Sequence, residues 1–302
     1  MLTAIIAVTL SAPDLGATET AYTTWLGYKV VDRGLVSQTL ASSWGAPLTE
    51  GREFVLLQPA SGAPTYLRIV QSPVTPGYAA LKTHGWNANE ILVKDPDALA
   101  ARFAAADSPF RVIGPPRPLS SSSTVRAMQA IGPAGELNYF TRIPPEGGTM
   151  IKTPAVSEVD RTFIVVLGGA DMSAMRSFYG DVLKTTVTPP YDTTVNVLQD
   201  AYSLPADHLT QLALVAISPG FLIELDQYPP QATARPVRNG DLPPGMAIVS
   251  FAAKDLDVDA LPWAVRPTAR TDVPYAGRRA GMLIGPAGEW IEVVLDDALS
   301  AP

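Results

Sequence analysis

The sequence predicts an α+β protein made of two tandem domains, and three observations lead to this prediction. The chain has 302 residues, and at about 100–200 residues per domain this length corresponds to two domains. Short motifs recur in the same order in both halves. Within each half, apolar strand patterns alternate with short helical patterns, so strands and helices are mixed along the chain.

Composition excludes several classes of protein and site. The hydrophobic fraction of 47% is enough for a sizeable core. The net charge is −7 and no basic cluster is present, which argues against a nucleic-acid partner. With no cysteine and only 2 histidines, the chain has no thiolate nucleophile, no disulfide and no three-histidine metal site.

The first ten residues are apolar, but they do not resemble a targeting or membrane segment. No basic residue precedes them, as a signal peptide requires, and a membrane helix needs about 20 apolar residues. We therefore expect residues 4–10 to form a buried strand, and we expect a cytoplasmic protein without a membrane partner.

The internal repeat defines the architecture. The second half repeats motifs of the first half in the same order, which indicates duplication rather than chance similarity. The paired motifs are Ile-Gly-Pro-Ala-Gly-Glu at 131–136 and 284–289, Asp14-Leu15 and Asp171-Met172, Tyr22 and Tyr179, and Lys94-Asp95 and Lys254-Asp255.

Each half reads as two modules of the order βαβββ. A strand (4–10; 162–168) ends near an Asp that suits a helix start, and a helix (15–25; 172–183) and three strands follow. The pattern then restarts, with a helix expected through Leu99 and Phe103 in the first half and through Leu261 in the second. Pro and Gly at 144–148 mark a linker. We predict domains at 1–143 and 161–302, joined by a linker at 144–160, with the modules paired within each half.

These features together resemble the vicinal-oxygen-chelate superfamily. The resemblance rests on the strand followed by an Asp-Leu helix start, the helix ending Leu26-Gly27-Tyr28, and the closing Gly-Pro-Ala-Gly-Glu turn. This superfamily includes glyoxalase I, extradiol dioxygenases and antibiotic-resistance binding proteins. It implies that two modules curl into a half-open barrel around a cavity, where four inward strand positions can hold a divalent metal.

Most of the metal-ligand positions implied by the resemblance carry side chains that are not metal ligands. They are Ala7, Arg68, Ala88 and Tyr139 in the first half and Ile164, Glu224, Ile248 and Glu292 in the second. Alanine and isoleucine offer no lone pairs to a metal. We therefore expect no cofactor and no tightly bound transition metal, although Glu224 and Glu292 could hold a hard cation loosely, with waters.

Two sets of inward polar residues are candidates for proton transfer. In the first half, Arg68 could clamp an anionic group, Glu90 could accept a proton and Tyr139 could donate one. In the second half, Glu224 and Glu292 could form an acid/base pair that shares a proton. The structural alternatives are an internal Arg68–Glu90 ion pair and glutamates on a solvated strand face.

The leading functional hypothesis is a metal-independent lyase or isomerase acting by proton transfer on a small hydrophobic or aromatic carbonyl compound. The alternatives are a non-catalytic protein that sequesters a small apolar molecule and a structural or regulatory relic. For the enzyme and for the sequestering protein, the expected partner is a small apolar or aromatic molecule. The chain could also form a homodimer. Fold alone does not decide among these functions.

Overall fold

The computed structural model describes residues 1–119, 122–146 and 150–296, and in these residues the strands form two mixed sheets of 8 and 9 strands. The first sheet contains β1 (Leu2–Ala12), β2 (Lys29–Leu35), β3 (Glu53–Gln58), β4 (Tyr66–Gln71), β14 (Gly245–Ala253), β15 (Val265–Ala269), β16 (Arg279–Ile284) and β17 (Trp290–Leu295). The second contains β5 (Gly85–Val93), β6 (Arg111–Leu119), β7 (Ser122–Ile131), β8 (Leu137–Arg142), β9 (Val159–Gly169), β10 (Thr186–Val187), β11 (Tyr191–Thr193), β12 (Thr210–Ser218) and β13 (Phe221–Gln227).

Short helices connect and cover these strands. They are α1 (Leu15–Thr20), α2 (Gln38–Trp44), α3 (Pro96–Phe103), α4 (Met172–Ser177) and α5 (Asn196–Tyr202). Both α1 and α4 begin at the predicted Asp caps and continue into a π-helical turn, at Ala21–Trp25 and Phe178–Val182. None of the helices in the described part of the chain is both long and apolar enough to span a bilayer.

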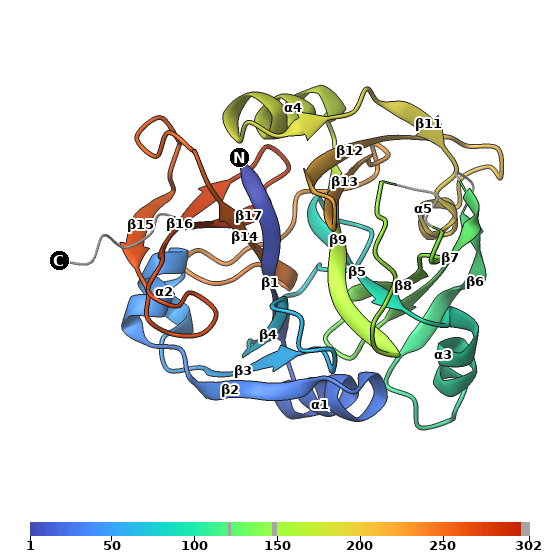
Figure 1. The fold of residues 1–302 in the computed structure, drawn as a ribbon, viewed down its shortest axis with the longest axis horizontal. Coiled ribbons are helices and arrows are strands. Elements are labelled where there is room, and N and C mark those ends of the chain that lie inside the picture. Colours follow the sequence, from blue (N-terminus) through green and yellow to red (C-terminus); the bar gives the residue numbers. More distant parts are fainter. Residues whose placement is uncertain (120–121, 147–149, 297–302) are drawn as a thin grey trace.

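The strand order corrects the expected pairing of modules. In the first sheet, β1 of the first module pairs antiparallel with β14 of the fourth, and in the second sheet β5 pairs with β9 (Figure 1). Each sheet therefore draws strands from both sides of the 144–160 linker, and the expectation that the modules of one half close one barrel is wrong. The physical reason is that all four first strands have similar apolar faces, so the pattern along one strand does not specify its partner.

Within each half, the helix of one module packs against the other module's last strand. The hydroxyl of Tyr22 donates to Glu136 Oε1 at 2.9 Å, and that of Tyr179 donates to Glu289 Oε1 at 3.2 Å. All four residues are buried. These are the residues that the sequence repeat pairs, so the repeat records the contact between modules of one half, while the sheets form across the halves.

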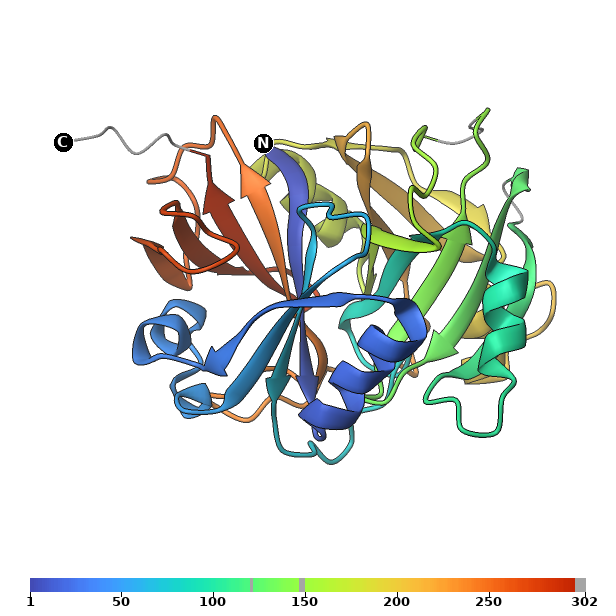
Figure 2. The ribbon, with the colours of Figure 1, turned by 60° about the horizontal axis from the view of Figure 1, so that its bottom comes forward.

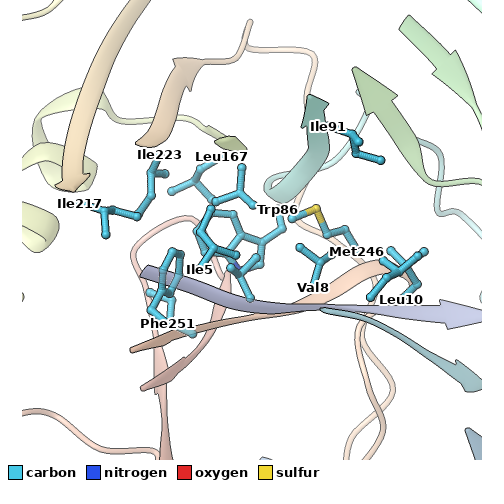
Figure 3. Packing of buried hydrophobic residues seen from close by; sticks show 14 of the residues in the cluster. Ile5, Val8, Leu10, Trp86, Ile91, Leu167, Ile217, Ile223, Met246 and Phe251 are labelled. Carbon is cyan, nitrogen blue, oxygen red and sulfur yellow. The ribbon is translucent and has the colours of Figure 1, made fainter. Parts of the chain in front are cut away.

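One hydrophobic core lies between the two sheets. Trp86 of β5 lies among Ile5 of β1, Leu167 of β9 and Phe251 of β14 (Figure 3), and its indole Nε1 donates to the carbonyl of Trp290 at 2.8 Å. The sheets thus pack back to back through β1, β14, β5 and β9, and Figure 2 shows the two groups of strands from a second direction. The opposite face of each sheet therefore lines an interior of its own.

One expected helix is wrong. The segment after Asp255 forms turns, with the amide of Ala260 donating to Asp257 O at 3.1 Å, instead of a helix through Leu261. Asp255 has a left-handed backbone (φ 53°), whereas the corresponding cap Asp95 is extended (φ −148°), so the chain does not enter a helix there, and Pro262 prevents a helix from continuing beyond Leu261. The corresponding helix in the first half, α3, runs through Leu99 and Phe103 as predicted.

Candidate functional site

The second sheet encloses a cavity of about 140 Å³. Its walls come from β5, β7, β8, β9, β12 and β13 together with β11, the start of α5 and the end of β6. Apolar side chains such as Ile164, Leu212 and Val197 alternate there with polar ones. This mixture of apolar wall and few polar groups is typical of a small-molecule site.

Three polar residues lie side by side on one wall of this cavity. Glu90 of β5 is the register partner of Tyr139 on β8, and Tyr139 is in turn the register partner of Gln129 on β7. Directly opposed residues share one face of a sheet, so all three side chains point the same way. All three are buried and line the cavity.

A second carboxylate faces them from the other module. Glu224 of β13 also lines the cavity, and Asp226, two residues further along the same strand face, is buried behind it. The second sheet therefore brings together Glu90 and Tyr139 from the first half with Glu224 from the second. The prediction of one site for Glu90 and Tyr139 and another for Glu224 is therefore wrong.

Burial changes the proton affinity of the carboxyl groups. Desolvation raises the pKa of Glu90 to about 7, although the hydrogen bond from Thr141 opposes this shift. Desolvation and then the charge of Glu90 raise the pKa of Asp226 to about 7. The pKa of Glu224 is raised well above its usual value by desolvation and by the nearby Asp226 and Glu90. Near neutral pH the cavity thus holds carboxyl groups that both give and take protons.

Tyr139 stays protonated in this environment. Desolvation, followed by the charges of Asp226 and Glu224, raises the pKa of its hydroxyl well above the usual value. No hydrogen bond from a described residue engages that hydroxyl, although the residue lines the cavity. The hydroxyl is therefore available to donate a hydrogen bond to a bound molecule.

The first sheet has a different interior. The guanidinium of Arg68 lies between Trp44 and Tyr275, 5.2 and 5.5 Å from the ring centroids. Glu292 accepts hydrogen bonds from the indole of Trp44 at 3.2 Å, from the hydroxyl of Tyr275 at 2.9 Å and from Ser250 at 2.5 Å. Glu292 is thus satisfied by buried neighbours, whereas Nη2 of the buried Arg68 has no hydrogen-bond partner among the described residues.

Two expected groupings are therefore wrong. Arg68 does not join Glu90 and Tyr139, because it lies in the first sheet beside Glu292 and the two others lie in the second. Glu224 and Glu292 form neither an acid/base pair nor a shared cation site, because β13 and β17 belong to different sheets. Both errors follow from assuming that each half closes on itself.

The strand register also refines the four metal-ligand positions that the resemblance implies. The first-strand residues opposite the last-strand positions are Thr9, Glu90, Val166 and Ser250, each two residues beyond the alanine or isoleucine expected. The second sheet thus presents Glu90, Tyr139, Val166 and Glu224, and the first presents Thr9, Arg68, Ser250 and Glu292.

Neither set fits a metal centre of the kind the fold family uses. A valine and a protonated tyrosine occupy two of the positions in the second sheet, and a guanidinium occupies one in the first. Across residues 1–119, 122–146 and 150–296, no three or more Asp, Glu, His or Cys side chains are grouped to hold a metal ion.

Sequence reasoning missed Asp226 and Gln129. A usable signal for Asp226 was present, since Glu224 and Asp226 are two apart on one strand and must share a face. Gln129 carried no such signal, because only the β7–β8 register places it beside Tyr139. The two histidines lie outside the cavity, with His84 in a separate groove beside Arg235.

Comparison with known proteins agrees with this architecture. No family model and no curated protein match the sequence. Glyoxalase I from Zea mays superposes with a TM-score of 0.61 at 14% identity over 96% of this chain and 91% of its own, and a point variant of the same enzyme with a TM-score of 0.63 at 14% identity over 96% and 93%. A candidate dioxygenase from Bacillus subtilis superposes with a TM-score of 0.61 at 11% identity over 98% and 86%. The chain has the vicinal-oxygen-chelate fold.

Proposed function

We propose that this chain is a metal-independent lyase or isomerase that moves a proton on a small hydrophobic or aromatic carbonyl compound in the cavity of the second sheet. The observation that carries the proposal is the pairing of Glu90 with Tyr139 on one cavity wall, with Glu224 facing the same space. A base, a hydrogen-bond donor and a second carboxyl group thus surround one small volume.

Each residue has a role that its environment supports. Glu90, with a pKa raised by burial to about 7, is partly ionised at neutral pH and is suited to accept a proton from the carbon next to the carbonyl. The hydroxyl of Tyr139 would hydrogen-bond the carbonyl oxygen, where negative charge develops as the proton leaves. Glu224 would return a proton or hold the substrate in place.

The chemistry of the donor set supports metal independence. Valine at position 166 and tyrosine at 139 offer a divalent ion little at positions where the fold family places ligands. Stabilisation of the developing charge would then come from hydrogen bonding by Tyr139 and from exclusion of water by Ile164 and Leu212.

Solvent isotope exchange tests the proposal without knowledge of the natural substrate. The protein is incubated in D₂O with EDTA and an aromatic ketone with an acidic α-hydrogen, such as phenylacetone, and ¹H NMR follows loss of the α-proton signal. We expect the wild type to accelerate exchange and Glu90→Gln to lose most of the acceleration, while the Glu292→Gln variant of the first sheet retains it. Equal exchange with and without protein across a panel of such ketones, with binding intact, would favour the sequestering protein instead.

A further inference from the structure

The carboxylates of the cavity differ from the other buried carboxylates of this chain in their partners. Glu136 accepts from the hydroxyl of Tyr22 and the amide of Ala134, and Glu289 accepts from Tyr179 and the amide of Ala287. Buried carboxylates are normally satisfied in this way. The fold is thus able to supply donors where a carboxylate has a structural role.

In the cavity the donors are missing. Glu224 has neither a hydrogen bond nor an ion pair with a described residue, and Glu90 receives a single hydrogen bond, from Thr141 at 2.6 Å. Asp226 Oδ1 is buried without a partner. An unsatisfied buried acceptor is costly, and the half-buried Glu224 faces the cavity, where a ligand can supply the missing donor.

Gln129 gives an independent indication of the same kind. Its side chain is 7% exposed and lines the cavity, and its Oε1 has no hydrogen-bond partner. The unpartnered buried atoms at this site, Gln129 Oε1 and Asp226 Oδ1, are both acceptors. A ligand that complements the lining residues Glu224 and Gln129 must offer N–H or O–H donors and carry no negative charge.

The charge of the site selects among such ligands. Within the described chain, Arg117 is the basic residue lining the cavity, and it forms no ion pair with Glu90, Glu224 or Asp226. The carboxyl groups therefore lie close to Tyr139, Tyr191 and one another, without an ion pair to Arg117. A positively charged ligand relieves this repulsion, and tyrosine rings attract cations as well.

We propose that the cavity recognises a protonated amine, so that the substrate carries an ammonium group as well as its carbonyl. The inference deepens the proposed function and rests on it. Glu224 and Gln129 accept N–H bonds from the ammonium, Asp226 adds negative charge behind Glu224, and Glu90 remains free to move the proton. Apolar side chains such as Ile164 and Leu212 suit an organic cation better than a hydrated metal ion.

Calorimetry with two probes of the same shape tests this proposal. Benzylamine is protonated at pH 7, whereas benzyl alcohol is neutral. We expect benzylamine to bind at least about tenfold more tightly, because hydrogen bonds to charged groups are stronger than neutral ones. Titration in two buffers of different ionisation enthalpy should also show proton release, because the cation favours ionised carboxylates. Equal affinities, or proton uptake, would overturn the proposal.

Single-residue variants test whether residues of the cavity cause the difference in affinity between the two probes. Glu224→Gln should weaken benzylamine binding about tenfold or more and leave benzyl alcohol unchanged. Arg117→Gln removes a like charge from the cavity and should tighten binding of benzylamine alone. The matched control is Glu289→Gln, which removes a buried carboxylate that has its own donors and should bind both probes as the wild type does. A Glu224→Gln protein that is folded by circular dichroism and binds benzylamine normally would refute the proposal.

Titration with a divalent metal ion, together with the isotope-exchange assay, distinguishes the remaining outcomes. If Ca²⁺ or Mn²⁺ displaces benzylamine and stabilises the wild type more than Glu224→Gln, the site is a metal site and the proposal is wrong. If phenylacetone exchanges its α-proton but benzylamine does not bind, only this inference fails. If benzylamine binds as expected and no aminoketone or ketone exchanges, the amine site stands and the catalytic proposal fails.

Discussion

Thr141 donates a hydrogen bond of 2.6 Å to Oε1 of Glu90, from two residues beyond Tyr139 on β8. This bond stabilises the ionised form of Glu90 against a burial that favours the neutral form. The pKa of the proposed base, raised mainly by desolvation, is therefore lowered in part by a neighbour that does not line the cavity.

Removal of this donor should shift the pH dependence upward. In Thr141→Val, desolvation acts on Glu90 without the opposing hydrogen bond, so its pKa rises above the value of about 7 in the wild type. The pH at which isotope exchange reaches half its maximum should rise by about one unit, as expected for the loss of a hydrogen bond to a charged group. Thr141→Ser keeps the hydroxyl and should keep the profile; an unshifted Thr141→Val profile excludes Glu90 as the titrating base.

Tyr139→Phe should separate catalysis from binding. The change removes only the hydroxyl, so the cavity keeps its shape, and turnover should fall by about 10²–10³-fold with a smaller change in KM. The measurement is the rate of α-proton exchange at saturating and limiting ketone. Glu292→Gln, in the first sheet, serves as the control and should exchange at nearly the wild-type rate. A mainly KM effect of Tyr139→Phe would assign the residue to binding.

The unfolding free energy should fall as the pH rises through neutrality. The pKa values of Glu90 and Asp226 are raised to about 7 in the folded chain, so the folded state binds more protons than the unfolded state. The stabilisation is complete below the unfolded pKa of about 4 to 4.5 and is lost as the pH rises through about 7. Urea unfolding from pH 4 to 8 measures the slope.

Asp226→Asn should make this fall shallower by up to about 1.4 kcal/mol per pH unit, the effect of one proton. The variant should be relatively most stabilised at pH 8, where the wild type holds the buried charge. If the wild type instead becomes steadily more stable from pH 5 to 8, the carboxyl groups of the cavity do not have raised pKa values.

The first sheet should tolerate loss of Arg68 and Glu292 together better than loss of Arg68 alone. Arg68→Met leaves Glu292 without the nearby cation and should destabilise the chain by about 3–5 kcal/mol. Arg68→Met combined with Glu292→Gln should recover part of that loss, and urea unfolding of the two singles and the double gives the coupling. Strict additivity would show that the Arg68 guanidinium is held by Trp44 and Tyr275 alone.

Much of the fold could be predicted from the sequence because the repeated motifs are short and form local structure. The Asp14 and Asp171 caps, the helix through Leu99 and Phe103 and the closing Gly-Pro-Ala-Gly-Glu turns depend on neighbouring residues. Those elements and the two-sheet architecture are confirmed. The partner of each first strand depends instead on which buried faces pack together, and all four first strands offer similar apolar faces.

The candidate site was predicted in its residues more than in its grouping. Glu90, Tyr139 and Glu224 were each selected as inward polar residues, but the sequence could not join them because β5 and β9 pair across the halves. Arg68 and Glu292 were selected by the same rule, and their contacts with Trp44 and Tyr275 join residues that are distant in sequence. The alternation along a strand shows to which face a side chain points, but it does not show which residues surround that side chain.

The pairing of the modules also sets an order of assembly during synthesis. The strands of the second sheet run without interruption from β5 to β13, so the enclosed cavity is encoded by one internal stretch of chain. The first sheet is encoded by the two flanking stretches, and β1 must wait for β14 to leave the ribosome before it gains its antiparallel neighbour. Until then one edge of β1 is unpaired, although β4 covers the other, so aggregation through this strand is favoured in the interval between the synthesis of β1 and that of β14.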